Sequence, residues 1–288
     1  MVKIFLGFIA LIVAGAPYSL RADCAVDPDA VWSKRAELIT DDHAGADAID
    51  QMIECYEDRV SGSNRDIAPY WKLMRALYFK GAFTLSRKGD QRLIFQRAIE
   101  VAETAIEVVK QSNILSTDLS SHELSSGDST NDASVDAAAI HFWAAVSWGS
   151  WAKTAGKLRA ARMGVADRIR DYATFVINLD SHYERAGGHR ILGRLHAQAP
   201  RLPWVTWWVS REKAVHELER AFKLYPTDAH NALYFAQALL EYRPERSDEA
   251  LAIIRNLIAR GPDPDRIVEE QVVIDEARRY QAAHSSSR

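Results

Sequence analysis

The sequence predicts an all-α protein in which about five helical hairpins stack into a solenoid, with a further helix capping the C-terminal end. Apolar residues recur at the three- and four-residue spacing of amphipathic helices through most of the chain. Runs of alternating apolar and polar residues bounded by turn residues, which would indicate strands, are absent from the sequence. A pattern of small and large residues also recurs along the chain, and such repetition is typical of solenoids.

The repeated pattern is clearest in the C-terminal half. In the segments 214–226 and 250–262, small and large residues follow one another at helical spacing and are followed by a proline. Proline cannot continue a helix, so each segment ends there. This spacing is typical of the second helix of a tetratricopeptide unit. The sequence therefore predicts tetratricopeptide-like hairpins.

Five hairpins account for most of the chain, and the predicted single domain spans residues 23–288. The small residue Gly193 marks a close approach between two helices, and the charged helix 265–283 suits a terminal cap. The Ser-, Asp- and Asn-rich residues 112–134 are predicted to be a mobile surface loop. The predicted helix pairs are 32–40 with 48–55, 71–78 with 98–105, 137–151 with 169–176, 187–196 with 214–226, and 229–242 with 250–262.

The first 22 residues are predicted to be a signal peptide. Lys3 supplies a positive charge, residues 4–16 are apolar, and Ala22 is a small residue at the cleavage position. We expect cleavage near Ala22 and a periplasmic protein; the alternative is an uncleaved N-terminal anchor. Asp23 stands before Cys24, where lipid-modifying processing requires a small neutral residue, so we do not expect a lipoprotein.

Export would place the two cysteines in an oxidising compartment. Cys24 lies at the mature N-terminus and Cys55 late in a predicted helix, and we expect a disulfide that fixes the start of the chain to the first hairpin. The alternative role, a cysteine nucleophile with a histidine partner, has no second signal in the sequence.

Charge and motif content argue against several classes of function. The net charge is −3, with 36 basic and 39 acidic residues, which is too balanced for a nucleic-acid-binding protein. His182, His189 and His196 are close in sequence but lack the spacing of a zinc site. Phosphate-binding, dinucleotide-binding and serine-hydrolase motifs are absent from the sequence. We therefore expect no catalysis, no metal and no cofactor.

One hairpin contains a tryptophan-rich insertion. Between Gly193 and Ala214 the chain is nine residues longer than a regular unit, and the insertion includes Trp204, Trp207 and Trp208. Insertions in repeat proteins map to one face, which is often the binding face. The three indoles could form an exposed surface for a ligand or partner, or fold back as a local core. The sequence leaves both open.

Several motifs, in their order, resemble the TatT family of tetratricopeptide-like periplasmic proteins associated with TRAP transporters. They are the stretch His141–Phe142–Trp143–Ala144, the helix start at Gly187–Gly188 with Leu192–Gly193, and the helix 214–226 after an insertion that contains proline. The resemblance covers about residues 32–262. It implies a non-catalytic trimer with a central pore, which docks the solute-receptor (P) component and passes on an apolar ligand. The missing lipobox departs from the family pattern.

Two functions of different class follow from these observations. In the first, the protein is a transport accessory that binds a small apolar ligand in an aromatic pocket or pore. In the second, it is a scaffold whose concave face holds a partner protein without any small ligand. The candidate residues for ligand or partner binding are Trp143, Trp148, Trp151, Arg190, Trp204, Trp207 and Trp208.

Overall fold

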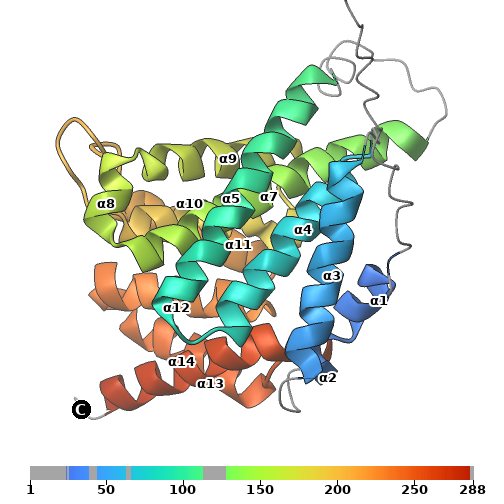
Figure 1. Cartoon of the computed structure of the whole chain (residues 1–288). Helices are drawn as coiled ribbons and strands as arrows, with labels where there is room; N and C mark the ends of the chain where they lie inside the picture. The colour runs from blue at the N-terminus through green and yellow to red at the C-terminus, as the bar shows by residue number, and fades with distance from the viewer. Residues whose placement is uncertain (1–23, 25, 39–43, 63–65, 113–127, 286–288) are drawn as a thin grey trace, which may run out of the picture.

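Thirteen α-helices make up the described part of the chain in the computed structural model, which comprises residues 24, 26–38, 44–62, 66–112 and 128–285. These residues form no β-strand, so the all-α prediction is confirmed (Figure 1). Within the same ranges, no helix combines the length and the apolar composition needed to cross a membrane. The predicted signal peptide, residues 1–22, lies outside the described residues.

The N-terminal hairpin contains three helices. α1 (Pro28–Ser33) and α2 (Arg35–Leu38) are separated at Lys34, and α3 (Ala44–Ser61) follows. The predicted single helix 32–40 is therefore two short helices, which begin earlier in the chain. Asp27 caps α1, because its carboxylate accepts a hydrogen bond from a backbone N–H of the first turn.

The second hairpin contains a widened helical turn. α4 (Ala68–Phe79) continues as a short π-helix, η1 (Lys80–Thr84), before α5 (Lys88–Gln111) begins. Gly81 is required in this turn, because a Cβ atom there would lie 2.5 Å from Cε1 of Phe95. The glycine thus lets a buried aromatic ring of α5 pack directly on the turn.

The third hairpin pairs α7 (Asp128–Ala155) with α9 (Val165–Leu179), and α8 (Lys157–Arg162) connects them. The last part of the predicted loop 112–134 is helical, because α7 already begins at Asp128, while residues 113–127 lie outside the described residues. The short helix α8 gives this hairpin a broad end, to which the candidate site extends.

The fourth hairpin confirms the predicted close approach at Gly193. It pairs α10 (Tyr183–Gln198) with α11 (Arg211–Leu224), and a Cβ atom at Gly193 would lie only 2.6 Å from Cγ of Leu218. The absence of a side chain at this position therefore sets the distance between the two helices.

The fifth hairpin and the cap complete the stack. α12 (Ala229–Tyr242) and α13 (Ser247–Arg260) are joined by the 3-10 turn η2 (Pro244–Arg246), and a second turn, η3 (Pro264–Arg266), leads into α14 (Ile267–Ser285). α14 packs on both α12 and α13, as expected of a capping helix.

The two ends of the solenoid meet. The Arg35 guanidinium on α2 donates a hydrogen bond from Nε to Glu269 of α14 at 2.7 Å, and Nη2 donates to the carbonyl of Asp265 at 3.0 Å. Val268 of α14 packs on the apolar cluster formed by the first two hairpins. Figure 1 shows α2 beside the C-terminal helices. The contact closes the concave face of the stack on the side where the two ends meet.

Candidate ligand-binding cavity

The concave face contains a cavity of about 840 Å³. Helices from every hairpin contribute to its lining, from Trp32 near the N-terminus to Glu269 on α14. Helical repeats turn their inner helices toward one axis, so side chains that are distant in sequence face the same space. This volume is typical of sites for small organic ligands.

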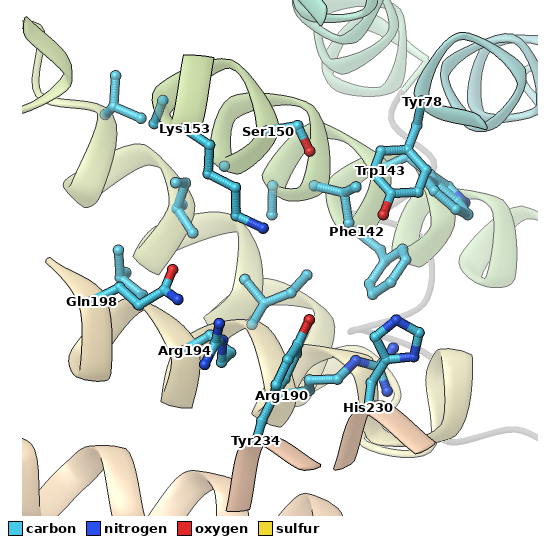
Figure 2. A pocket seen from close by; sticks show the side chains of 18 of the residues that line it. Tyr78, Phe142, Trp143, Ser150, Lys153, Arg190, Arg194, Gln198, His230 and Tyr234 are labelled. Atoms are coloured by element: carbon cyan, nitrogen blue, oxygen red, sulfur yellow. The ribbon is translucent and has the colours of Figure 1, made fainter. Parts of the chain in front are cut away.

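One wall of the cavity is apolar. α7 contributes Ala145, Gly149 and Ala152, whose small side chains leave the space open, and Phe142 and Trp143 border it nearby (Figure 2). On the other helices, apolar lining residues include Val165, Ile169, Ile191 and Leu195. The wall can therefore bury the hydrocarbon part of a ligand.

The ionisable lining residues are mainly basic. Eight of them are Arg or Lys and two are Glu, although the whole chain has a net charge of −3. Arg35, Arg185, Arg190 and Arg266 form ion pairs with carboxylates. The other four have no ion-pair partner among the described residues: Arg75, Lys153, Lys157 and Arg194. The cavity thus carries uncompensated positive charge.

Arg75 lies between two indole rings. Its guanidinium carbon is 3.9 Å from the ring centroid of Trp32 and 4.8 Å from that of Trp71. Burial lowers the pKa of Arg75 from its ordinary value, and its Nε is buried without a hydrogen-bond partner among the described residues. A buried donor that lacks a partner is costly, so this nitrogen is suited to a ligand acceptor.

Arg194 and Lys153 approach the cavity from opposite helices (Figure 2). Arg194 donates a hydrogen bond to the neutral side chain of Gln237 at 2.8 Å and lies 3.9 Å from the ring centroid of Tyr234. Neither contact neutralises its charge. Both cations are therefore available to an anionic group of a ligand.

His230 lines the cavity without carrying a charge at neutral pH. Burial lowers its pKa to about 3; the nearby charges of Arg190 and Arg266 act in the same direction, against the charge of Asp228. Its Nδ1 has no hydrogen-bond partner among the described residues. The ring can thus take part in a neutral hydrogen bond with a ligand.

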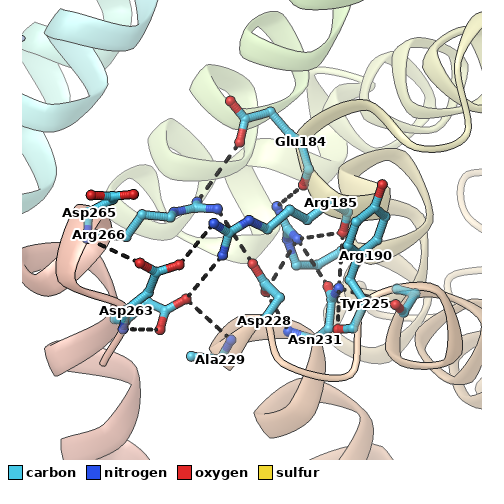
Figure 3. A network of polar contacts seen from close by, with 12 residues as sticks. Glu184, Arg185, Arg190, Tyr225, Asp228, Ala229, Asn231, Asp263, Asp265 and Arg266 are labelled. Atoms are coloured by element: carbon cyan, nitrogen blue, oxygen red, sulfur yellow. Dashed lines mark hydrogen bonds and ion pairs between the residues drawn. The ribbon is translucent and has the colours of Figure 1, made fainter. Parts of the chain in front are cut away.

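A strained turn at the start of α10 borders the cavity. Glu184, Arg185 and Ala186 have φ angles of 48°, 57° and 62°, a left-handed conformation that non-glycine residues rarely adopt. The carbonyl of Glu184 accepts a hydrogen bond from Arg190 Nη2 at 3.2 Å, and that of Arg185 accepts one from Asn231 at 3.0 Å (Figure 3). Strain held in this way is typical of functional sites.

Arg190, a predicted binding residue, lines the cavity, but its guanidinium mainly supports the strained turn. Its Nη1 donates to Oδ1 of Asn231 at 3.0 Å and lies 3.5 Å from the carboxylate of Asp228. Burial alone would raise the pKa of Asp228, but the charges of Arg190 and Arg266 outweigh this effect and lower it. Arg190 is thus a positioning residue of the cavity wall.

The predicted tryptophans of α7 have different environments. Trp143 lines the cavity, and its ring centroid is 5.7 Å from that of Tyr78. Trp148 and Trp151 do not line it; they pack edge to face at 5.9 Å in an apolar cluster between helices. Trp148 and Trp151 are three positions apart and share a face of α7, whereas Trp143, five positions before Trp148, faces another side of the helix.

The tryptophan-rich insertion combines the two alternatives that the sequence left open. Trp208 is anchored, because its Nε1 donates to Oδ1 of Asp167 at 3.0 Å and its ring packs edge to face on His196. Trp204 and Trp207 are 96% and 67% exposed. The insertion is therefore fixed to the protein by one indole and presents two to solvent.

The side chains of Cys24 and Cys55 are close together, and both thiols are free. Burial, together with a hydrogen bond to Cys24, raises the pKa of the Cys55 thiol to about 11. The predicted Cys24–Cys55 disulfide stays a prediction.

The clustered histidines have separate protein partners. His189 Nδ1 lies 2.7 Å from a carboxylate oxygen of Glu217, and His196 Nδ1 accepts a hydrogen bond from the N–H of Ser210 at 3.1 Å. No group of three or more His, Cys, Asp or Glu side chains suited to a metal ion occurs among the described residues.

Sequence reasoning missed most of the polar residues of the cavity. Arg75, Lys153, Arg194, His230 and Tyr234 come from four helices, and no local motif joins them. One signal was present: Arg75 replaces the small residue that a tetratricopeptide unit has at this position. A charged side chain at a position where helices normally pack closely indicates that this side of the helix borders a cavity.

Comparison with known proteins identifies the fold. No family model and no curated protein matches the sequence. Among solved structures, the chain is similar to TTC0263, a thermophilic TPR protein of Thermus thermophilus, with a TM-score of 0.52, 14% identity, and coverage of 87% of this chain and 98% of that one. Yeast Tom70 is a more distant match, with a TM-score of 0.29, 13% identity, and coverage of 91% of this chain and 66% of that one. The chain therefore has the helical-hairpin solenoid fold of tetratricopeptide-repeat (TPR) proteins.

Proposed function

We propose that this protein is a non-catalytic, periplasmic accessory component of a TRAP-type solute transport system, which holds an amphipathic anion in its cavity and binds the solute-receptor protein. The observation that carries the ligand-binding part is the cavity of about 840 Å³ with an apolar wall and an excess of basic side chains. TPR-like solenoids are suited to protein-protein interaction, and this supports the proposed binding to the solute-receptor protein.

The proposed ligand has an apolar body and one anionic group. The small residues of α7 leave room for a hydrocarbon chain, while Arg75, Lys153 and Arg194 lack carboxylate partners among the described residues. An anionic group beside one of these cations would gain charge-assisted hydrogen bonds. A neutral apolar ligand would leave the charges uncompensated, so the apolar ligand of the sequence analysis becomes an apolar acid in this proposal.

The transport association rests on the resemblance to the TatT family. Phe142 and Trp143, which belong to one of the resembling motifs, line the cavity, and Gly193 of another motif sets the spacing of the helices beside it. Export, a trimeric assembly and the P component as partner are parts of the same proposal. Capture of a purified TRAP solute-receptor protein, and the mass of the assembly in solution, test them.

Ligand binding is tested with dodecanoate and its neutral analogue dodecanol by native mass spectrometry and tryptophan fluorescence. We expect dodecanoate to bind more tightly. In Lys153→Gln/Arg194→Gln, dodecanoate affinity should fall about tenfold with little change for dodecanol, because a charge-assisted hydrogen bond is lost. Arg255→Gln, at an exposed position on α13, is the matched control.

A second variant tests the space itself. A Cβ atom at Gly149 would meet nothing closer than 4.0 Å, so Gly149→Phe can extend into the cavity without a clash at the backbone. This change should abolish the binding of both probes. Gly89→Phe, at an open and exposed site on α5, is the control. Binding that survives Gly149→Phe, or a wild-type protein that binds the receptor but neither probe, would favour the alternative function, a scaffold without a small ligand.

A further inference from the structure

The cavity opens at one end of the molecule. Among its lining residues, those with exposed side chains or backbone are Lys153, Gly156, Lys157 and Gln198. They lie where α7 ends, α8 begins and α10 ends. The tryptophan-rich loop continues directly from the end of α10. The mouth of the cavity is therefore bordered by α8 and this loop.

We use the name rim for α8 with Met163 together with the loop of residues 199–209. Figure 1 shows the loop after α10 running beside α8. Ala160 of α8 and Ala199 and Trp208 of the loop belong to one apolar cluster. The hydrogen bond from Trp208 to Asp167, directly after α8, fixes the loop there. The rim is thus one continuous surface built from two segments.

Exposed apolar side chains are concentrated on the rim. Of the ten large apolar residues that are exposed in the described part of the chain, five belong to it. Trp204 is 96% exposed and Trp207 67%. Surface apolar residues are usually scattered, and a group of them marks an interaction site. The remaining three of the five exposed apolar residues on the rim are Leu158, Met163 and Val205.

The charged residues of the rim and its flanks have a single sign. The segments 153–166 and 197–211 contain six Lys or Arg residues and no Asp or Glu. Two acids directly follow these segments in sequence: Asp167, which pairs with Arg170 at 2.9 Å and accepts the hydrogen bond from Trp208, and the exposed Glu212 at the start of α11. This positive surface contrasts with the net charge of −3 of the whole chain.

We propose that the rim binds the surface of an anionic lipid membrane, with Trp204 and Trp207 inserted at the level of the headgroups. Indole rings prefer the membrane interface, and neighbouring Lys and Arg side chains are attracted to anionic lipids. A surface of uniform positive charge is complementary to lipid headgroups of uniform negative charge. In this orientation the cavity mouth faces the bilayer.

The test is flotation of the purified mature protein, residues 23–288, with vesicles of phosphatidylcholine alone or mixed with phosphatidylglycerol. We expect binding to the mixed vesicles, with a blue shift of tryptophan emission, because Trp204 and Trp207 leave water. Trp204→Ser/Trp207→Ser should lower partitioning on the order of tenfold and remove the shift. Leu93→Ser, at a side chain that is 68% exposed on α5, is the matched control.

Charge is tested separately with Arg162→Glu/Arg201→Glu. Each cation contributes about a fivefold gain in partitioning near an anionic surface, so this variant should bind at least about 20-fold more weakly. Arg255→Glu/Arg279→Glu, at exposed positions on α13 and α14, makes the same change of charge elsewhere and should bind like wild type. Circular dichroism confirms folding of each variant.

The outcomes distinguish this inference from the proposed function. Dodecanoate binding measured without vesicles should be unchanged in the rim variants. The proposal is overturned if the wild-type protein does not bind mixed vesicles. It is also overturned if the tryptophan variant and the charge-reversal variant both bind them as tightly as wild type. If wild type does not bind mixed vesicles and the rim variants lose capture of the receptor protein, the rim is a protein-binding surface. Vesicle binding without any dodecanoate binding would leave the rim proposal standing and remove the cavity proposal.

Discussion

The Arg35 guanidinium of α2 and the Glu269 carboxylate of α14 are 2.7 Å apart, although 234 residues separate them in the sequence. Their side chains are only 9% and 12% exposed. The pair joins the first hairpin to the cap and encloses the concave face of the solenoid. The cavity therefore depends on a contact between the two ends of the chain.

Removing one partner of this pair should destabilise the protein. Arg35→Met leaves the Glu269 carboxylate nearly buried without its cation, which costs about 2 to 4 kcal/mol. Denaturant unfolding measures this cost. Arg278→Met is the control, because its ion pair with Asp275 is about half exposed and should contribute less than about 1 kcal/mol. Equal effects of the two variants would show that the closure does not contribute to stability.

Gly193→Leu should lower the melting temperature. A side chain at this position meets Leu218, whose Cγ is 2.6 Å from the site of a Cβ atom, and the overpacking costs about 1 to 3 kcal/mol. Gly89→Leu is the matched control, since no atom lies within 4 Å of a Cβ there. An unchanged melting curve for Gly193→Leu would contradict the helix register.

Trp204→Gly should stabilise the protein, by up to about 1 kcal/mol, because the residue has a φ of 66° that glycine adopts without steric cost. Its side chain is 96% exposed, so little packing is lost. Trp207→Gly, in the same loop, should destabilise by a similar amount, since its φ is not positive. Denaturant titration measures the free energies of unfolding of the two variants. Equal destabilisation by both would show that the backbone at Trp204 is not strained.

Acidification should destabilise the protein through two histidines, His196, which is buried, and His230, which is partly buried. The pKa of His230 is lowered to about 3 and that of His196 to about 4, while an unfolded histidine titrates near pH 6.5. Below about pH 6.5 the unfolded state binds more protons, so stability falls as the pH drops toward these values. His230→Gln should make the stability profile between about pH 6.5 and 4.5 flatter.

Oxidation should join Cys24 and Cys55. The hydrogen bond between the two side chains places the thiols close enough to react, and the resulting loop would contribute about 3 kcal/mol on the chain-entropy model. Non-reducing peptide mapping of the purified protein after oxidation with glutathione disulfide shows whether the bond forms. Cys24→Ser should then lower the melting temperature only under oxidising conditions.

The sequence by itself determined the helices, their pairing and much of their register. The periodicity around Gly193, Leu218 and Pro226 carries this information locally, because a helix buries residues three and four positions apart and ends at a proline. For the same reason, the first helix was predicted poorly: the segment 32–40 is short and breaks at Lys34.

Only the tertiary structure decided what the concave face encloses. Small rotations between successive hairpins add up over the whole solenoid, and no local pattern encodes their sum. The sum brings Arg35 to Glu269 and gathers Arg75, Lys153 and Arg194 around one cavity. The arrangement of the hairpins also separates the indoles. Trp208 donates a hydrogen bond to Asp167, whereas Trp204 is exposed to solvent. These contacts join residues from different hairpins, so only the folded arrangement of the hairpins creates them.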